Sequence, residues 1–198
     1  MSNAAFVARH TCDSPEWYTP SPFVEAARAV MGGIDLDPAS HEEANQTVKA
    51  ARFFTEQDDG LQQPWEGRVF LNPPGGLVGP FWRKLMREWI NGLSQAIWIG
   101  YSLEQLQTLQ QVGAHKTPLD FPMCFPRVRV AFVENEAKRL VRLSKIDAEN
   151  ALRRDRGEKL KRRSERADSP SHANYVTYLG GDANRFVEVF SRFGQTRE

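Results

Sequence analysis

Arg68-Val69-Phe70-Leu71-Asn72-Pro73-Pro74 has the pattern of a buried β-strand that stops at a rigid turn. Proline donates no N–H to a sheet ladder and holds the preceding residue extended, so the strand cannot continue past Asn72. Between Pro80 and Ile90, large apolar residues recur on one helical face, which predicts an amphipathic helix. This order of strand, turn and helix is the repeating unit of an α/β fold.

The same alternation continues on both sides of this unit. Helices are predicted near Phe23 to Val30 before Gly32-Gly33, from a Ser102/Gln105 capping box to Gly113, and after Asp182. Strands are predicted at Ile34 to Asp37, Ala96 to Ile99, Val128 to Phe132 and Tyr175 to Leu179. The sequence therefore predicts an α/β sandwich with a largely parallel, Rossmann-like sheet.

Length and composition predict a single domain. Residues 1–15 lack periodicity and are expected to form a loose leader, so the domain covers residues 16–198, with a basic helical insertion at about 134–170. The chain has no apolar run near the ~20 residues of a membrane span and no signal-peptide pattern, which predicts a cytoplasmic protein without a membrane partner. Its two cysteines and four scattered histidines show no ligand spacing, so no metal is expected.

Positive charge is concentrated in one segment of the chain. From Lys138 to Arg166 there are twelve Lys or Arg and five Asp or Glu, a charge of +7, so the rest of the chain sums to −6 against the total of +1. A basic segment on a mildly acidic body favours a polyanionic partner. Arg153, Arg154 and Arg156 are its candidate phosphate-binding residues.

The Asn-Pro-Pro turn can activate an amino group attached to an aromatic ring. Such a nitrogen is a poor nucleophile because its lone pair is delocalised into the ring. Two acceptors aimed at its N–H bonds, the Asn72 side-chain oxygen and the Pro73 carbonyl, would restore a directed lone pair. Pro73 and Pro74 stiffen the turn and offer no competing N–H.

A methyl donor that carries an ammonium group and a carboxylate needs a protein partner for each. Asp37, followed by Pro38, is the candidate for the ammonium group, and Asp35 is the alternative. The hydroxyl and backbone amides of Tyr18-Thr19-Pro20 can meet the carboxylate.

Taken in order, these motifs resemble the phage and prophage DNA adenine methyltransferase family. The resemblance rests on Glu16-Trp17-Tyr18-Thr19-Pro20, Gly33-Ile34-Asp35-Leu36-Asp37-Pro38-Ala39, Phe53-Phe54-Thr55, Asp59-Gly60-Leu61, Trp65, Val69-Phe70-Leu71-Asn72-Pro73-Pro74, Cys124-Phe125-Pro126-Arg127 and Ser171-His172-Ala173-Asn174. It implies a Rossmann-like methyltransferase fold, S-adenosylmethionine as donor, and adenine in DNA as acceptor, in a bacterial host or phage-infected cell. It also implies a catalytic role for Asn72, Pro73 and Pro74, and cofactor binding by Asp37, Pro38 and the Tyr18-Thr19-Pro20 segment.

The chain departs from this family's pattern at Gly75, where many amino-methyltransferases have an aromatic residue that stacks on the target base. Phe81, Trp82 and Tyr101 are the candidate replacements. Two other functions remain open at this point. One is methylation of the cytosine amino group, which needs the same two acceptors, and the other is an inactive DNA-binding protein that keeps the methyltransferase fold.

Overall fold

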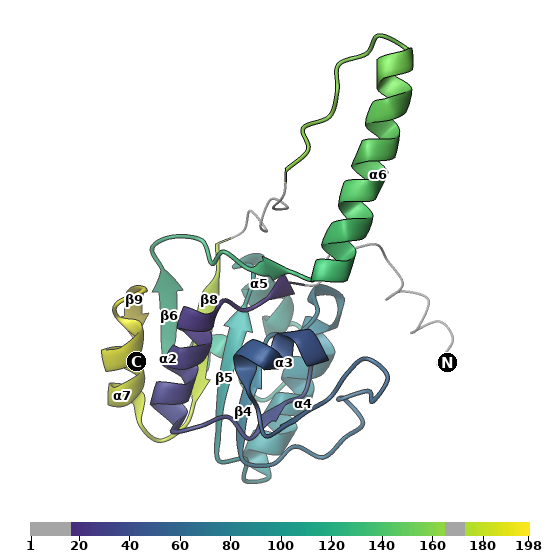
Figure 1. Ribbon diagram of the computed structural model, residues 1–198. Helices are drawn as coiled ribbons and strands as arrows, with labels where there is room; N and C mark the ends of the chain where they lie inside the picture. Colours follow the sequence, from purple (N-terminus) through teal and green to yellow (C-terminus); the bar gives the residue numbers. More distant parts are fainter. Residues whose placement is uncertain (1–16, 165–172) are drawn as a thin grey trace. The chain divides into compact units, whose positions relative to one another are not determined.

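The computed structural model describes residues 17–164 and 173–198, which form two compact units (Figure 1). The larger unit consists of residues 19–131 and 173–198, and the smaller one of residues 17–18 and 132–164. The predicted leader, Glu16 and the Ser171-His172 pair lie outside the described residues. The predicted basic insertion at about 134–170 falls, where it is described, in the smaller unit.

The larger unit is built on a seven-stranded sheet in the order β3-β2-β4-β5-β8-β6-β9. Its strands are β2 (Leu36–Asp37), β3 (Arg52–Phe53), β4 (Arg68–Leu71), β5 (Gln95–Gly100), β6 (Met123–Pro126), β8 (Tyr175–Leu179) and β9 (Gly194–Arg197). Its helices are α2 (Ser21–Met31), α3 (Glu42–Val48), α4 (Val78–Ile90), α5 (Glu104–Gln110) and α7 (Ala183–Phe190), with short 3-10 turns η1 (Gly75–Leu77) and η2 (Pro118–Asp120). The predicted α/β class is therefore confirmed.

The sheet is mixed, which corrects the expectation of a largely parallel one. Strands β3, β2, β4 and β5 pair in parallel, as expected for strands joined through helices. The pairs β5·β8, β8·β6 and β6·β9 are antiparallel. The direction reverses at β8, which lies between β5 and β6 in the sheet. The chain reaches β8 from the smaller unit, and no β-helix-β crossover joins β8 to its neighbours.

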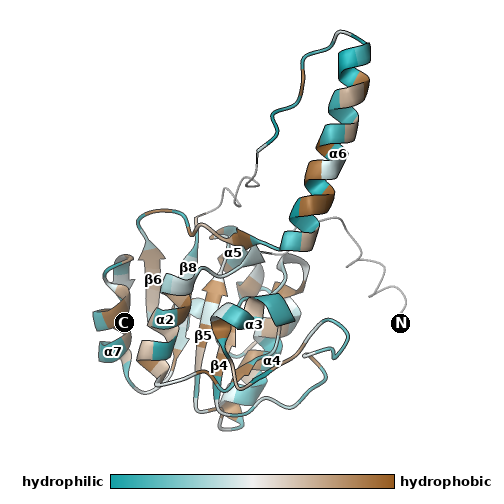
Figure 2. Cartoon of the chain, viewed as in Figure 1, coloured by the Kyte–Doolittle hydropathy of each residue, from teal (hydrophilic) through white to brown (hydrophobic). Residues whose placement is uncertain are grey.

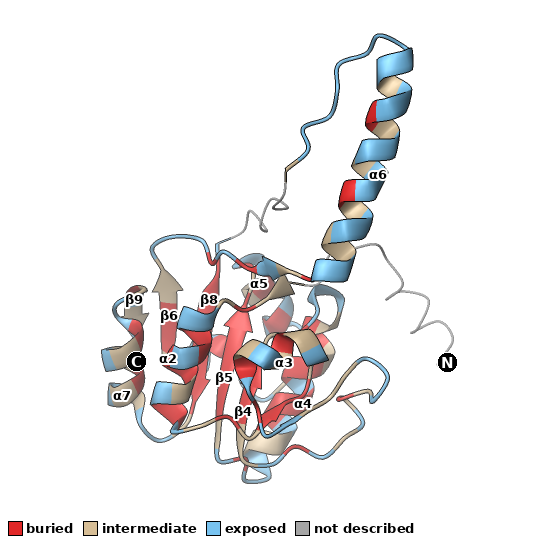
Figure 3. Cartoon of the chain, viewed as in Figure 1, coloured by how far each residue is buried: buried red, intermediate tan, exposed pale blue. Residues whose placement is uncertain are grey.

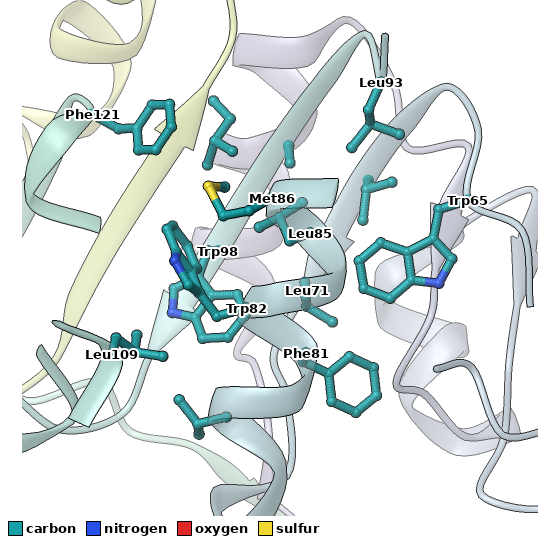
Figure 4. Packing of buried hydrophobic residues seen from close by; sticks show 14 of the residues in the cluster. Trp65, Leu71, Phe81, Trp82, Leu85, Met86, Leu93, Trp98, Leu109 and Phe121 are labelled. Atoms are coloured by element: carbon teal, nitrogen blue, oxygen red, sulfur yellow. The ribbon is translucent and has the colours of Figure 1, made fainter. Parts of the chain in front are cut away.

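The core explains why these segments fold as predicted. Strands β5 and β8 consist mainly of apolar residues because both faces of the sheet are covered. Figure 3 shows both strands buried, and Figure 2 shows the hydrophobic character of β5. The rings of Trp82 on α4 and Trp98 on β5 meet edge to face, with centroids 5.0 Å apart (Figure 4). Burying two such rings stabilises the contact between α4 and the sheet.

Local capping signals set several helix ends. Gly32 follows α2 in a left-handed conformation with φ of 77°, and the Asp182 side chain accepts the Arg185 N–H at the start of α7, both as predicted. The predicted Ser102/Gln105 capping box is wrong. The Ser102 hydroxyl instead accepts the Glu104 N–H at 3.1 Å, and α5 begins at Glu104.

The smaller unit pairs two short strands and carries one long helix. Strand β1 (Trp17–Tyr18) runs antiparallel to β7 (Val133–Glu134), and α6 covers Glu136–Asp155. The Asn135 side chain caps α6 by accepting the Lys138 N–H at 3.0 Å. Most of α6 is exposed, apart from buried positions that include Leu143 and Asn150 (Figure 3).

The strand predicted at Val128–Phe132 is wrong. The chain forms β6 just before it, and β7 just after it, and the alternating residues themselves have no strand partner. Asn174 explains the difference, because its side-chain oxygen accepts the Val130 N–H at 2.9 Å. Burial follows the alternation only in part, since Val130 and Phe132 are buried while Val128, which should share their face, is exposed.

Within residues 17–164 and 173–198, none of the helices has both the length and the apolar character needed to cross a membrane. The same residues contain no cluster of three or more His, Cys, Asp or Glu side chains placed to hold a metal ion.

Candidate active site

The two predicted motifs leave the sheet side by side. Strands β2 and β4 are parallel neighbours with Leu36 opposite Val69, so Asp37 and Asn72 emerge at the same carboxyl edge. Strand β5 lies on the other side of β4 with Trp98 opposite Leu71, which brings Tyr101 out at this edge as well. The carboxyl edge of parallel strands is where α/β proteins bind their ligands.

Asp37 is a buried carboxylate at this edge, with a side chain held out of water. Its Oδ1 accepts the Ala39 N–H at 3.2 Å, and the residue is 3% exposed. Burial raises the pKa of Asp37 to about 7, and the Ala39 N–H offsets this only in part. None of the described residues forms an ion pair with Asp37. Its carboxylate is therefore available to pair with a bound cation.

Asp35, the alternative to Asp37, has a structural partner. The Arg68 guanidinium donates to its two carboxylate oxygens at 2.7 and 2.6 Å, and the Arg68 N–H donates to it at 2.8 Å. These hydrogen bonds lower the pKa of Asp35. Because Arg68 opens β4, this ion pair lies at the amino end of that strand, and the structure does not bring Asp35 to the Asn72 edge.

A hydrogen bond closes the Asn-Pro-Pro turn. Pro73 is buried, and the Pro74 carbonyl accepts the Leu77 N–H at 2.8 Å, which closes the turn into η1. The Asn72 side chain is partly exposed beside this turn. The turn's own hydrogen bond uses Pro74 and leaves the Pro73 carbonyl as an acceptor next to Asn72.

The N-terminal motif is divided between the two units. Tyr18 belongs to the smaller unit, where the Asn135 amide donates to its hydroxyl at 2.6 Å. Thr19 and Pro20 belong to the larger unit and precede α2. The Thr19 side chain is 4% exposed, and its hydroxyl has no hydrogen-bond partner among the described residues.

The direction of α2 places Thr19 toward the same edge as Asp37. The helix ends at Gly32-Gly33, and Gly33 lies against the Arg68 side chain at the amino end of β4. A helix of 11 residues is about 16 Å long, so its first turn lies toward the carboxyl edge. The helix dipole places partial positive charge at this end, although Pro22 has no N–H and the Phe23 and Val24 N–H groups are bonded to the Pro20 carbonyl.

Gly60 supports the cofactor motif in a way that the sequence analysis did not anticipate. A Cβ at this position would overlap the Pro38 carbonyl oxygen, so only glycine lets the loop approach the Asp37-Pro38 turn. The Trp65 indole N–H fixes the loop by donating to the Gly60 carbonyl at 2.8 Å. The Asp59-Gly60 dipeptide and Trp65, already noted in the sequence, were the available signal.

We expect Gly60→Ala to weaken S-adenosylmethionine binding by moving this loop away from Pro38. Overpacking of this kind costs about 1–3 kcal/mol of folding stability, so the melting temperature should drop, and the displaced turn should bind the cofactor more weakly. Calorimetry and thermal unfolding would measure the two effects. Gly181→Ala is the matched control, because a Cβ there meets open space. Unchanged affinity in Gly60→Ala would show that the close approach is dispensable.

The three candidate phosphate-binding arginines differ in their surroundings. Arg153 forms ion pairs with Glu149 and Glu158 at 3.1 and 3.4 Å and donates to the Lys159 carbonyl. Arg154 and Arg156 are exposed and form no ion pair with the described residues. Arg153 therefore has a structural role in the smaller unit that the other two lack.

The segment after α6 folds back along this helix. Asn150 clamps it with two hydrogen bonds, donating to the Lys161 carbonyl at 3.0 Å and accepting the Lys161 N–H at 2.7 Å. Ion pairs join Lys161 to Glu149 and Arg163 to Asp147. Lys159 and Arg162 are exposed in this returning segment and form no ion pair with the described residues.

The fold therefore brings a buried carboxylate and two oxygen acceptors to one edge of a mixed sheet. The model of the DNA N-6-adenine-methyltransferase (Dam) family matches residues 9–148, and the chain belongs to this family. It is therefore a DNA adenine methyltransferase that uses S-adenosylmethionine as its methyl donor. No curated protein and no solved structure matches the chain.

Proposed function

We propose that methyl transfer takes place at the carboxyl edge of β2 and β4, with Asp37 holding the donor and Asn72 and Pro73 holding the target adenine. The observation that carries this assignment is the parallel register of the two strands, which brings a buried carboxylate and the Asn-Pro-Pro turn out at one edge. S-adenosylmethionine supplies an electrophilic methyl group when bound.

The donor's ammonium group fits the environment of Asp37. A buried carboxylate without an ion-pair partner among the described residues gains most from a ligand cation, because the two charges meet where water does not screen them. A bound cation also lowers the pKa of the carboxyl and keeps it ionised. Pro38 and Gly60 keep the backbone of this turn in place.

The donor's carboxylate fits the start of α2. Two features there favour an anion: the buried Thr19 hydroxyl without a partner among the described residues, and the partial positive charge of the helix dipole at the start of α2. Pro20 orients this turn, since its carbonyl accepts the Phe23 N–H at 3.0 Å. Tyr18, in the smaller unit, remains a proposed cofactor residue on the strength of the family resemblance alone.

Asn72 and Pro73 act on the adenine amino group. Its two N–H bonds donate to the Asn72 side-chain oxygen and the Pro73 carbonyl, which draws the nitrogen toward tetrahedral geometry and directs its lone pair at the methyl group. Pro74 contributes rigidity, because its φ of −56° and its bond to Leu77 hold the turn. The acceptors are thus oriented before the base arrives, as electrostatic catalysis requires.

We further propose that the smaller unit binds the DNA backbone through four exposed cations. Arg154 and Arg156 come from the predicted set, and Lys159 and Arg162 join them from the returning segment. Arg153 remains a predicted DNA-binding residue, but its two ion pairs assign it first to holding the turn after α6. Phosphate contacts of this kind supply affinity without reading sequence.

Replacing Arg154, Arg156, Lys159 and Arg162 by glutamine should weaken all duplex sequences equally and flatten the salt dependence of binding. The slope of log affinity against log salt should fall by about 0.9 for each phosphate that is no longer neutralised. Titrations at several salt concentrations would measure it, with cofactor affinity unchanged. Arg153→Gln is the control. It should lower the melting temperature and change the salt dependence of DNA binding only slightly. An unaltered slope in the quadruple variant would exclude this surface, and a weakened sequence preference at constant slope would mean that these side chains read bases.

We infer a Rossmann-like methyltransferase arrangement from the order β3-β2-β4-β5, in which the two motif-bearing strands are central neighbours. The family resemblance also supports a phage or prophage origin and a place of action in the bacterial cytoplasm, where the DNA substrate lies.

Label transfer from S-adenosylmethionine tests the proposal. The protein is incubated with unmethylated DNA and methyl-labelled donor, the DNA is digested to nucleosides, and the labelled nucleoside is identified. We expect the label in N6-methyl-deoxyadenosine. Label in deoxycytidine would indicate a cytosine methyltransferase, and DNA binding without label or cofactor binding would indicate an inactive relative of the family.

A further inference from the structure

Tyr101 occupies the place where a side chain on residue 75 would lie. If Gly75 carried a Cβ, its three nearest neighbours would be the Oη, Cε1 and Cζ atoms of Tyr101, at 2.8, 3.1 and 3.2 Å. Gly75 does not have a positive φ, so its backbone would accept other residues. The Tyr101 ring, and not backbone strain, is what keeps this position small.

Two interactions fix Tyr101 at the site. It follows β5, whose pairing with β4 brings the two strand ends out together. The buried Asn174 side chain then donates to the Tyr101 carbonyl at 2.8 Å, while its oxygen accepts the Val130 N–H. Asn174 thus holds the backbone of Tyr101 in a defined position, and the ring remains partly exposed beside the Asn-Pro-Pro turn.

The other two aromatic candidates are inside the core. Phe81 is 4% exposed, and Trp82 is fully buried with its indole N–H donated to the Lys116 carbonyl at 2.8 Å. Figure 4 shows both among the packed side chains of α4 and the sheet. Neither can reach a base without unfolding that packing.

We propose that Tyr101 is the aromatic platform for the target base, supplied from the end of β5 in place of a ring on residue 75. A base removed from its duplex loses stacking on both sides, and an aromatic side chain beside the catalytic acceptors recovers part of it. This inference rests on the proposed function, because it requires the adenine to be held at Asn72 and Pro73. Asn174 is a positioning residue that acts through Tyr101.

Replacing the ring tests its role directly. Tyr101→Leu keeps an apolar side chain but removes the π-face, so kcat/KM for unmethylated DNA should fall roughly 10- to 100-fold at constant S-adenosylmethionine affinity. Tyr101→Phe should retain activity. Trp89→Leu is the matched control, a partly buried ring at the far end of α4, and should leave kcat/KM unchanged. Full activity in Tyr101→Leu, or equal loss in Tyr101→Phe, would overturn the stacking role.

Exchanging the two side chains gives a second test. Gly75→Phe alone should lower kcat/KM, because the new side chain and Tyr101 compete for one space. Combining Gly75→Phe with Tyr101→Ala should recover activity that both single variants lack. A double variant no better than the worse single one would contradict the idea that the two positions serve one platform.

The inference and the proposed function can fail separately. If the unaltered protein labels no adenine, the proposed function fails. If it labels adenine and the Tyr101 variants fold, bind the cofactor and match its kcat/KM, only the role of Tyr101 fails. Thermal unfolding and calorimetric cofactor binding on each variant make this distinction.

Discussion

Asn72→Ala is expected to reduce the methyl-transfer rate by at least about 10²–10³-fold, because removing one preoriented hydrogen-bonding partner of the transition state has an effect of this size. The loss should appear in kcat and leave S-adenosylmethionine affinity within about twofold, since the proposed role of this side chain is to contact the base and not the donor. Single-turnover labelling of unmethylated DNA measures the rate, and calorimetry measures the affinity.

Two further substitutions separate the acceptor oxygen from the shape of the side chain. Asn72→Asp keeps acceptor oxygens and should retain measurable turnover, whereas Asn72→Leu has similar bulk without an acceptor and should match Asn72→Ala. Turnover within tenfold of the unaltered enzyme in both Asn72→Ala and Asn72→Leu would remove Asn72 from the catalytic machinery.

Asp37→Asn should weaken S-adenosylmethionine binding by roughly 10- to 100-fold, because the substitution would remove the charge-assisted hydrogen bond that we propose to the donor's ammonium group. Asp35→Asn should leave the affinity nearly unchanged and lower stability, since it breaks the ion pair with Arg68. The opposite pattern, with the affinity loss in Asp35→Asn, would move the cofactor role to Asp35.

The raised pKa of Asp37 sets the pH dependence of cofactor binding. In the free protein this pKa is about 7, so the carboxyl is increasingly protonated as the pH falls below 7. Affinity should then fall with decreasing pH, approaching a tenfold loss per pH unit, and this slope should disappear in Asp37→Asn. Calorimetry between pH 5.5 and 7 would measure both.

Burial of Asp37 should also make the same substitution stabilising when no cofactor is bound. The folded state binds the Asp37 proton more tightly than the unfolded state, whose pKa is near 4, so protonated Asp37 favours folding and this advantage is lost as the pH rises through about 7. Asp37→Asn should therefore raise the melting temperature at pH 8 and leave it unchanged near pH 4. An equal change at both pH values would mean that charge burial is not the cause.

Local patterns in the sequence predicted much of the secondary structure of the larger unit. The proline pair ended β4 at Leu71, and apolar spacing together with Gly32 and Asp182 fixed parts of α2 and α7, because these signals act within one or two helical turns. The parallel half of the sheet followed from the same alternation. The Asn-Pro-Pro turn and Asp37 were also predicted from the sequence as site residues, since their chemistry depends on residue type and on the ends of strands.

Long-range contacts decided the rest. Periodicity predicted a strand at Val128–Phe132, but whether a strand has a pairing partner depends on the fold. Here the Asn174 side chain, and not a neighbouring strand, accepts the Val130 N–H. Long-range contacts also decide which charged residues form ion pairs. Asp35 and Asp37 are nearly equivalent in sequence, and only the approach of Arg68 commits Asp35 to the structure. Likewise, the pairing of β4 with β5 brings Tyr101 to Gly75, 26 positions earlier in the chain, because parallel neighbours end at the same edge whatever their separation in sequence.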